Sequence, residues 1–206
     1  MASVQPRRGG LRWVKSLTNP GLGTPPIIEK VVATANATAL FAGDALREQT
    51  DGTLLPAAAG ETISHVMIAA SNYVGADALT RQGAYLPAST AFTGTVSLTN
   101  PLASKVLVIP VLNQVFEVDC PTAAATTTAA YALINQCVDI VATAGSTANG
   151  QSGFTTDTVA NFASTTASAQ LLLRDIPAYG LDGTLNDVTA TYWKGYYTVY
   201  EVQTPA

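Results

Sequence analysis

The side chains that could carry out catalysis are few and scattered in this sequence. Its one histidine, His65, stands in the apolar stretch TISHVMIAA, and Glu61 precedes it at a spacing that shares one face of a strand. A lone histidine with one carboxylate lacks the further partners that catalysis or metal binding requires. We therefore expect His65 to be a packed or surface residue.

Other chemical motifs are also incomplete. Ser152 lies in the sequence GQSG, which lacks the G-x-S-x-G spacing of a nucleophile elbow. Asp175, Asp182 and Asp187 are near one another in sequence, but without the alternating D-x-D-x-D-G pattern of a calcium loop. The sequence contains neither a glycine-rich phosphate loop nor the Cys/His spacing of a zinc site. These patterns predict that the chain is not an enzyme and holds no metal or cofactor.

The most distinctive basic residues lie in the N-terminal stretch, residues 1–26 (MASVQPRRGGLRWVKSLTNPGLGTPP). This stretch contains no acidic residue, and its basic residues are Arg7, Arg8, Arg12 and Lys15. Because glycine and proline interrupt it throughout, it cannot sustain a helix, and it has too few apolar side chains to build a core. We expect an extended arm that lies on another surface, with Trp13 as an anchor in its middle.

Charge is divided unevenly between this arm and the rest of the chain. The whole sequence has 10 basic and 14 acidic residues, for a net charge of −4. With four of the basic residues in the arm, residues 27–206 hold a clear acidic excess. A basic arm on an acidic body favours an acidic partner surface, which a neighbouring copy could supply. Four basic residues neutralise few phosphates, so nucleic acid is a poor partner.

The overall composition predicts a surface that is covered in an assembly. Hydrophobic residues make up 48% of the chain and charged residues only 12%, and a surface so poor in charge is badly protected against self-association. Cys120 and Cys137 form neither a metal motif nor a disulfide framework, which indicates reduced, buried thiols in a cytoplasmic environment. The longest apolar run, residues 106–112, is too short to cross a membrane.

Short stretches rich in β-branched residues, separated by turn residues, predict an all-β body over residues 27–206. The pair Asp51-Gly52 between two apolar runs predicts a hairpin, and a weak repeat of this unit at residues 77–88 predicts a second one. Two hairpins close together favour a sandwich or barrel of short strands. One short helix is expected near residues 122–132.

The C-terminal stretch at residues 188–202 (VTATYWKGYYTVYEV) gathers aromatic side chains. Alternation along a strand would place some of them in the core. For the others a subunit interface is favoured over a sugar-binding surface, since interfaces are enriched in tyrosine and tryptophan. The residues concerned are Tyr192, Trp193, Tyr196, Tyr197 and Tyr200.

The order of these parts resembles the capsid cement (decoration) proteins of tailed bacteriophages. A glycine- and proline-broken basic arm and a strand are followed by GDALREQTDGTLLPAAAGETISHVMIAAS, which is similar to a run in many small phage head proteins. Residues 111–119 (VLNQVFEVD) and the loop NGQSGF, with Asp157 downstream of it, add to the likeness. None of these motifs is catalytic.

The resemblance implies a β-barrel or jelly-roll body that binds the outer surface of the major capsid protein lattice, as a dimer or trimer, and stabilises the head. The basic arm would reach across a subunit boundary, its four cationic side chains contacting coat carboxylates and Trp13 buried as an anchor. The protein would then lie on the capsid exterior of the virion, after assembly in the host cytoplasm. Deleting residues 1–26 is expected to weaken capsid binding while the body stays folded.

Two alternatives remain open. The chain could have another structural role in the same particle, as a tail or fibre component. It could also be a carbohydrate-binding module that uses Trp193 and the neighbouring tyrosines.

Overall fold

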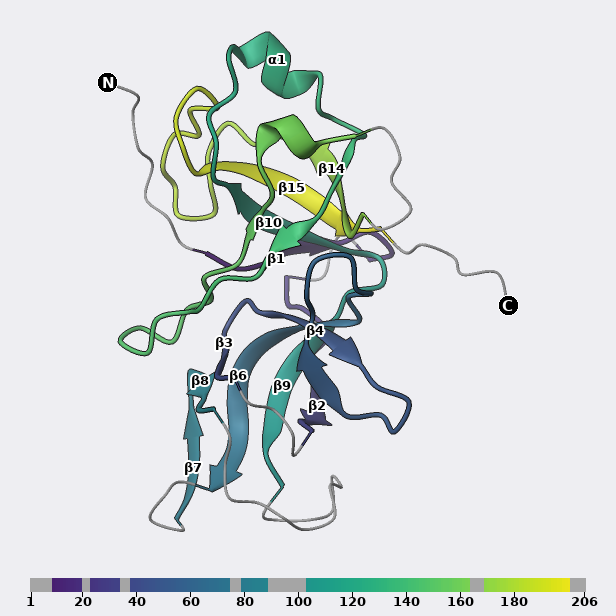
Figure 1. The fold of residues 1–206 in the computed structure, drawn as a ribbon, viewed down its shortest axis with the longest axis vertical. Helices are drawn as coiled ribbons and strands as arrows, with labels where there is room; N and C mark the ends of the chain where they lie inside the picture. Colours follow the sequence, from purple (N-terminus) through teal and green to yellow (C-terminus); the bar gives the residue numbers. More distant parts are fainter. Residues whose placement is uncertain are drawn as a thin grey trace.

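The computed structural model describes residues 9–19, 23–33, 38–74, 79–88, 103–163 and 169–200. Over these residues the chain forms two main sheets, one above the other in Figure 1, with a single short α-helix at one end. Neighbouring strands of both sheets are antiparallel, which confirms the all-β prediction. A closed barrel or jelly roll does not follow from these open strand orders and stays a prediction.

The upper sheet has five strands in the described part of the chain. In spatial order they are β1 (Arg12–Ser16), β10 (Gln114–Cys120), β15 (Trp193–Val199), β14 (Leu171–Asp175) and β11 (Cys137–Val138). Two further short strands, β12 (Ile140–Val141) and β13 (Thr155–Thr156), pair with each other and not with this sheet. Every residue of β10 is buried, so both faces of the sheet are covered at this strand.

The lower sheet is built from strands between residues 28 and 110. Its path is β2 (Ile28–Val31), β9 (Lys105–Pro110), β6 (His65–Val74), β4 (Ala45–Glu48) and β5 (Leu54–Pro56), with β7 (Thr80–Gly83) also paired to β6. The short strands β3 (Leu40–Phe41) and β8 (Tyr85–Leu86) pair with each other.

The first predicted hairpin is confirmed and the second is wrong. Strands β4 and β5 pair around the turn at Asp51-Gly52, where the Asp51 carboxylate accepts the Thr53 amide at 3.0 Å and Gly52 has a φ of 80°. In the repeat, by contrast, β7 pairs with β6 and β8 pairs with β3. Similar turn residues are therefore followed by different strand pairings in the two places.

The expected short helix is α1 (Thr127–Tyr131), and a single 3₁₀ turn, η1 (Val159–Asn161), follows later. Thr126 caps α1, since its hydroxyl accepts the Ala129 amide at 3.1 Å. No helix in the part of the chain that the structure describes is long and apolar enough to span a membrane.

One hydrophobic cluster joins the two sheets. It combines Phe116, Trp193 and Tyr197 of the upper sheet with Val66 and Ile109 of the lower one, all buried. Strands β9 and β10 pass from one sheet to the other through a turn of only three residues, 111–113. The shared core and this short connection hold the sheets together as one packed body.

Candidate functional site

Residues 9–17 of the expected arm belong to the folded body. Strand β1 pairs with β10, so that Trp13 lies opposite Phe116, and Leu11 is buried in the core that joins the two sheets. The Leu17 amide donates to the Asn113 carbonyl at 2.8 Å and extends the contact beyond the strand. The expectation that residues 1–26 form an arm separate from the body is corrected for residues 12–16, which form an ordered strand of the upper sheet that a deletion of 1–26 would remove.

The basic and aromatic residues of the expected arm have different positions. The Trp13 indole is half-buried and donates to the side-chain oxygen of Gln114 at 2.8 Å. Arg12 is half-buried and Lys15 is exposed. Arg7 and Arg8 lie outside the described residues.

Arg12 belongs to a buried group of charges that we call the Arg12 cluster: Arg12, Glu117, Asp119 and Lys194. Its Nη2 atom lies 2.7 Å from Asp119 Oδ1 and 2.9 Å from Glu117 Oε1. The Lys194 backbone lies opposite Asp119 in the pairing of β10 with β15, and all three partners of Arg12 in the cluster are almost fully buried. Two cations and two anions thus compensate one another inside the protein.

Two backbone amides complete the cluster. The Gly9 amide donates to Asp119 Oδ2 at 3.1 Å, and the Leu181 amide donates to Glu117 Oε2 at 2.8 Å. Burial raises the pKa of Glu117, while Arg12, the Leu181 amide and Lys194 oppose that rise. The cluster therefore fixes both the N-terminal segment and a distant loop to strand β10.

Beside the cluster, three segments meet at what we call the glycine junction: residues 9–11, 42–44 and 150–154. Gly10 donates its amide to the Phe154 carbonyl at 2.7 Å, and the Leu11 amide donates to Gly43 at 2.8 Å. Both glycines have positive φ, 76° and 94°, and a Cβ built on Gly10 would lie 2.9 Å from the Gly43 Cα. Only glycine permits the backbones to approach this closely.

Asp44 is the buried acid of the glycine junction. Its Oδ2 atom accepts the Phe41 amide at 2.8 Å. Burial raises the pKa of Asp44 to about 6, and hydrogen bonds from the Ser152 side chain and the Phe41 backbone oppose the rise. The folded protein therefore holds a proton on this carboxyl at a pH where an exposed aspartate has lost it.

We expect Asp44→Asn to change how stability depends on pH. The native state binds the proton more tightly than the unfolded chain, so this residue's contribution to the unfolding free energy falls as pH rises from about 4 to about 6. The asparagine variant should gain up to about 3 kcal/mol relative to wild type between pH 4 and pH 7. Urea unfolding at several pH values measures the difference, and a constant difference would contradict the assignment.

A groove opens between β1 and the lower sheet. It encloses about 360 Å³, and its lining includes Leu11, Val66, Met67 and Ile109. Arg12 is the one charged residue among the described residues that line it. We call it the Arg12 groove. Of the atoms that the structure places, Nε and Nη1 of Arg12 are buried and have no hydrogen-bond partner. The described lining of the groove is thus mostly apolar, and its charged residue is already paired with Glu117 and Asp119.

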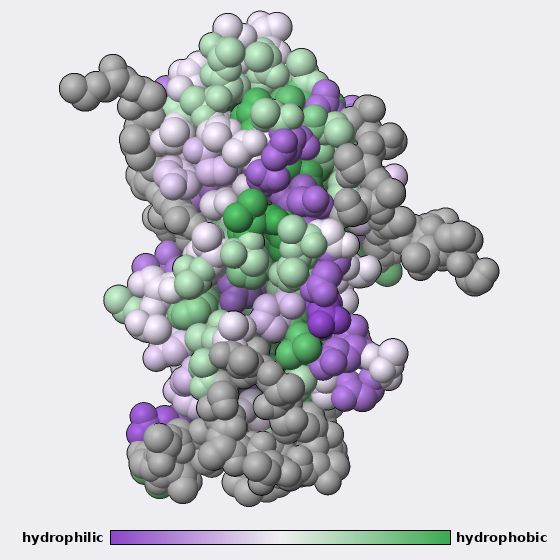
Figure 2. Space-filling model, viewed as in Figure 1, coloured by the Kyte–Doolittle hydropathy of each residue, from purple (hydrophilic) through white to green (hydrophobic). Residues whose placement is uncertain are grey.

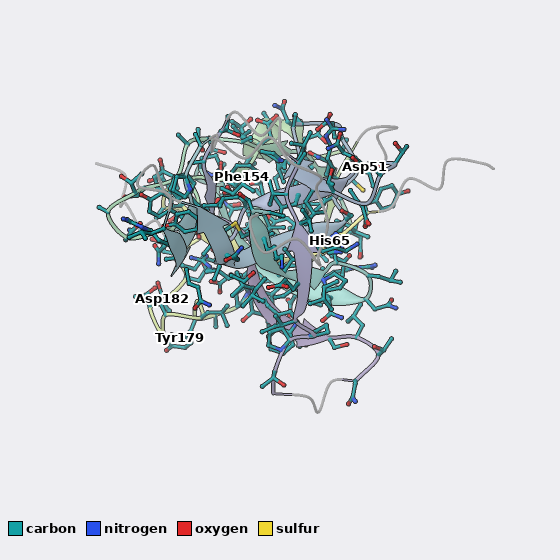
Figure 3. All side chains as sticks on the ribbon, turned by 90° about the horizontal axis from the view of Figure 1, so that it is seen from below. Asp51, His65, Phe154, Tyr179 and Asp182 are labelled. Carbon is teal, nitrogen blue, oxygen red and sulfur yellow. The ribbon has the colours of Figure 1, made fainter. Side chains whose placement is uncertain are left out.

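A hydrogen-bonded loop at residues 177–186, which we call the Tyr179 loop, stands out from the upper sheet. The Gly180 amide donates to the Thr184 carbonyl at 2.9 Å, and Asp182 Oδ1 accepts the Thr184 amide at 3.0 Å. The Asn186 side chain donates to the Pro177 carbonyl at 2.8 Å and closes the loop. Figure 3 shows Tyr179 and Asp182 on this loop, at the edge of the molecule.

The Tyr179 loop exposes apolar side chains although its backbone is well ordered by these bonds. Tyr179 is 60% exposed, Leu181 50% and Leu185 66%. The composition of the loop contains a signal for this surface, since two glycines and three large apolar residues occur within residues 177–186. Composition alone cannot show which of these apolar side chains are exposed.

The aromatic residues of the C-terminal stretch divide into two groups. Trp193 and Tyr197 are fully buried, so the expectation that they form a subunit interface is wrong. The Trp193 indole donates to the Thr122 carbonyl at 2.8 Å inside the protein. Tyr192 and Tyr196 are half-buried and Tyr200 is exposed, and their role at an interface stays a prediction.

Glu61 forms an ion pair with Arg47 at 3.1 Å and is not the acidic partner of His65. His65 is buried, and its acidic neighbour is Glu48. Its Nδ1 atom lies 2.9 Å from Ser64 Oγ and 3.9 Å from Glu48 Oε2. In a catalytic triad the nucleophile and the acid contact different ring nitrogens, so this arrangement is not one. Within the described ranges, no three His, Cys, Asp or Glu side chains gather as metal ligands do.

Comparisons of the chain with protein-family models, curated proteins and solved structures found no match. The features available for a functional conclusion are therefore the surface, the Arg12 groove and the Tyr179 loop.

Proposed function

We propose that this chain is a structural subunit of a bacteriophage particle: a capsid cement protein that binds the outer face of the major capsid protein lattice, contacts copies of itself and stabilises the head. One observation carries the proposal. Large apolar side chains stand exposed on an ordered, hydrogen-bonded loop of a chain with only 12% charged residues. Such a surface is typical of a protein whose partner covers it.

The visible face of the molecule is consistent with a surface made to be covered. Figure 2 shows green and pale residues over much of this face, with purple residues in separate patches. Leu112, in the turn between β9 and β10, is 62% exposed and adds a further apolar contact point. Together with the resemblance in sequence, these features favour a binding role.

Physical linkage explains how such a subunit would stabilise a capsid. A protein that binds the assembled lattice and not its free subunits shifts the equilibrium toward the lattice by mass action. The exposed Lys15, with Arg7 and Arg8, would meet coat carboxylates in this proposal. Arg12 and Trp13 would act indirectly, by holding the strand that carries Lys15.

Of the two alternatives, a tail or fibre component would also be covered by its partners, so the same exposed apolar surface fits that role. The carbohydrate-binding module is disfavoured, because the tryptophan it would use for stacking on a sugar ring, Trp193, is buried and hydrogen-bonded to Thr122. The copy number of the protein in particles separates the two roles that remain.

The proposal is tested by quantitative mass spectrometry of particles purified from the protein's source. We expect one copy per coat subunit, or a simple fraction of that ratio, in intact heads and in heads separated from tails. A few copies per particle, lost with the tails, would support the tail alternative. Absence from particles would overturn the proposal.

A further inference from the structure

We propose that this protein forms an internal amide bond, in which the side-chain amine of Lys194 is joined to the side-chain carboxyl of Asp119. The bond would connect the neighbouring strands β15 and β10 inside the upper sheet. The inference concerns the chain by itself and does not depend on capsid binding. Purified protein is sufficient to test it, so the two proposals fail separately.

Lys194 and Asp119 lie where their side chains can meet. They are directly opposite each other in the antiparallel pairing of β10 with β15, two strands that run side by side in Figure 1. Side chains of directly opposed residues point to the same face of a sheet, with Cβ atoms about 5 Å apart. A lysine side chain is longer than this separation, so its amine can reach the carboxyl carbon across the strand pair.

Both side chains are completely buried, which is rare for charged residues. The stem of Lys194 packs against the Tyr179 loop, where a Cβ built on Gly180 would lie 2.8 Å from the Lys194 Cε. Glycine at position 180 therefore leaves the space that the lysine occupies. The fold thus holds the amine away from solvent, on the same sheet face as an equally buried carboxyl group.

The Asp119 carboxyl group is held by donors on both of its oxygens. Nη2 of Arg12 lies 2.7 Å from Oδ1, and the Gly9 amide donates to Oδ2 at 3.1 Å. When an amine adds to a carboxyl carbon, negative charge develops on oxygen, and donors that are already in place stabilise that charge. Arg12 and Gly9 therefore act on this carboxyl group as an oxyanion hole acts on a carbonyl group.

Glu117 is placed to transfer the protons. It lies two residues before Asp119 on the same face of β10, and its neighbours in the electrostatic sense include Lys194. Burial raises the pKa of Glu117, against the opposing influence of Arg12, the Leu181 amide and Lys194. A carboxylate with a raised pKa accepts a proton more readily than an exposed one does.

The reaction is a condensation that balances without any co-reactant. The lysine ammonium first gives a proton to the carboxylates, and the uncharged Nζ of Lys194 then forms a bond to Cγ of Asp119. Glu117 takes the second proton from nitrogen and passes it to the departing hydroxyl group, so the C–O bond breaks and one water leaves. One ammonium and one carboxylate thus become one amide and one water.

Removal of buried charge favours the bond. Before the reaction the Arg12 cluster holds two cations and two anions, and after it Arg12 remains paired with Glu117, whose Oε1 atom lies 2.9 Å from Nη2. A neutral amide costs less to bury than an ammonium and a carboxylate do. Lys194 is the cation that reacts, because the guanidinium of Arg12 keeps its proton and is no nucleophile.

Intact mass spectrometry of the purified, denatured protein tests the inference. We expect a mass lower than that of the sequence by one water, after allowance for any removal of Met1. Trypsin then locates the bond, since it cuts after lysine and arginine but not after a lysine whose amine is part of an amide. The linked protein should yield residues 106–174 joined to residues 175–206, with the link between Asp119 and Lys194 in tandem mass spectra.

Lys194→Arg keeps the buried positive charge but lacks a nucleophilic amine, so this variant should keep the full mass of its sequence. Lys15→Arg is the matched control, because it makes the same change at an exposed lysine and should lose one water as wild type does. Asp119→Asn should release ammonia instead of water and form the same linked product. Circular dichroism verifies that the variants are folded.

Wild-type protein that keeps the full mass of its sequence would overturn the inference. So would a link at Glu117 in place of Asp119, or a Lys194→Arg variant that still loses water. Because the mass of wild type is decisive by itself, the test does not depend on whether every variant folds.

Discussion

Replacing Arg12 by alanine is expected to lower the free energy of unfolding by about 3 to 5 kcal/mol, because it leaves buried carboxylates without their cation. Glu117 and Asp119 are almost fully buried, and Nη2 of Arg12 lies within 3 Å of both. Urea unfolding followed by tryptophan fluorescence measures the loss. An unchanged midpoint would contradict the structure of the Arg12 cluster.

The pH dependence of this variant provides an independent check. Burial already raises the pKa of Glu117, and removal of Arg12 raises it further because Arg12 is the largest influence that opposes the rise. The native state then binds a proton more tightly than the unfolded chain does. The variant should therefore recover part of its stability as pH falls toward 4, relative to wild type.

Two further substitutions test whether the lost charge of Arg12 causes the loss of stability. Lys15→Ala removes an exposed cation from the same strand and should change stability by less than about 0.5 kcal/mol. Adding Glu117→Gln to Arg12→Ala removes one unpaired charge and should restore part of the lost stability. If the double variant is no more stable than Arg12→Ala, lost packing of the arginine side chain explains the effect instead.

The second large effect is expected at the glycine junction, where Gly10→Ala should destabilise the protein by roughly 4 kcal/mol or more. The new Cβ would lie 2.7 Å from the Ser152 Cβ and 2.9 Å from the Gly43 Cα and oxygen. Backbone atoms on one side and a buried side chain on the other leave no direction in which the methyl group can move. Thermal and urea unfolding both report the change.

Gly183→Ala is the matched control for this prediction. Gly183 has a φ of 77°, close to the 76° of Gly10, yet nothing lies within 4 Å of its Cβ position. Gly183→Ala should therefore lose stability only through backbone strain, on the order of 1 kcal/mol. Equal losses in the two variants would mean that the close contact of residues 10, 43 and 152 contributes nothing, against the packing described above.

The sequence predicted those parts of the fold that depend on local pattern. The Asp51-Gly52 hairpin and the short helix at α1 each follow from a few neighbouring residues. The pairing of β1 with β10 could not be predicted, because the Arg12 and Asp119 side chains that meet there are 107 positions apart. Glycine and proline around β1 also conceal a strand of only five residues.

The candidate site was predictable only in outline. Alternation in VFEVD indicates a strand with one polar face, and such a face is ordinarily exposed. Here Glu117 and Asp119 are buried, because the positive charges of Arg12 and Lys194 compensate their negative charges. The same limit explains the error at Trp193 and Tyr197, since the pattern shows which residues share a face but not which face another element covers.

The position of β10 in its sheet has a consequence for protein synthesis. Its two neighbours are β1 and β15, the first and the last strands of the described chain. During translation β1 can pair only after β10 has been made, and β10 can pair on its other side only after β15 has been made. The upper sheet therefore cannot form completely before Val199 has been synthesised. A prematurely terminated chain would leave the acids of β10 without Lys194 and the core without Trp193. Copies that end before β15 would then not complete the upper sheet, which would keep them out of any assembly that this protein joins.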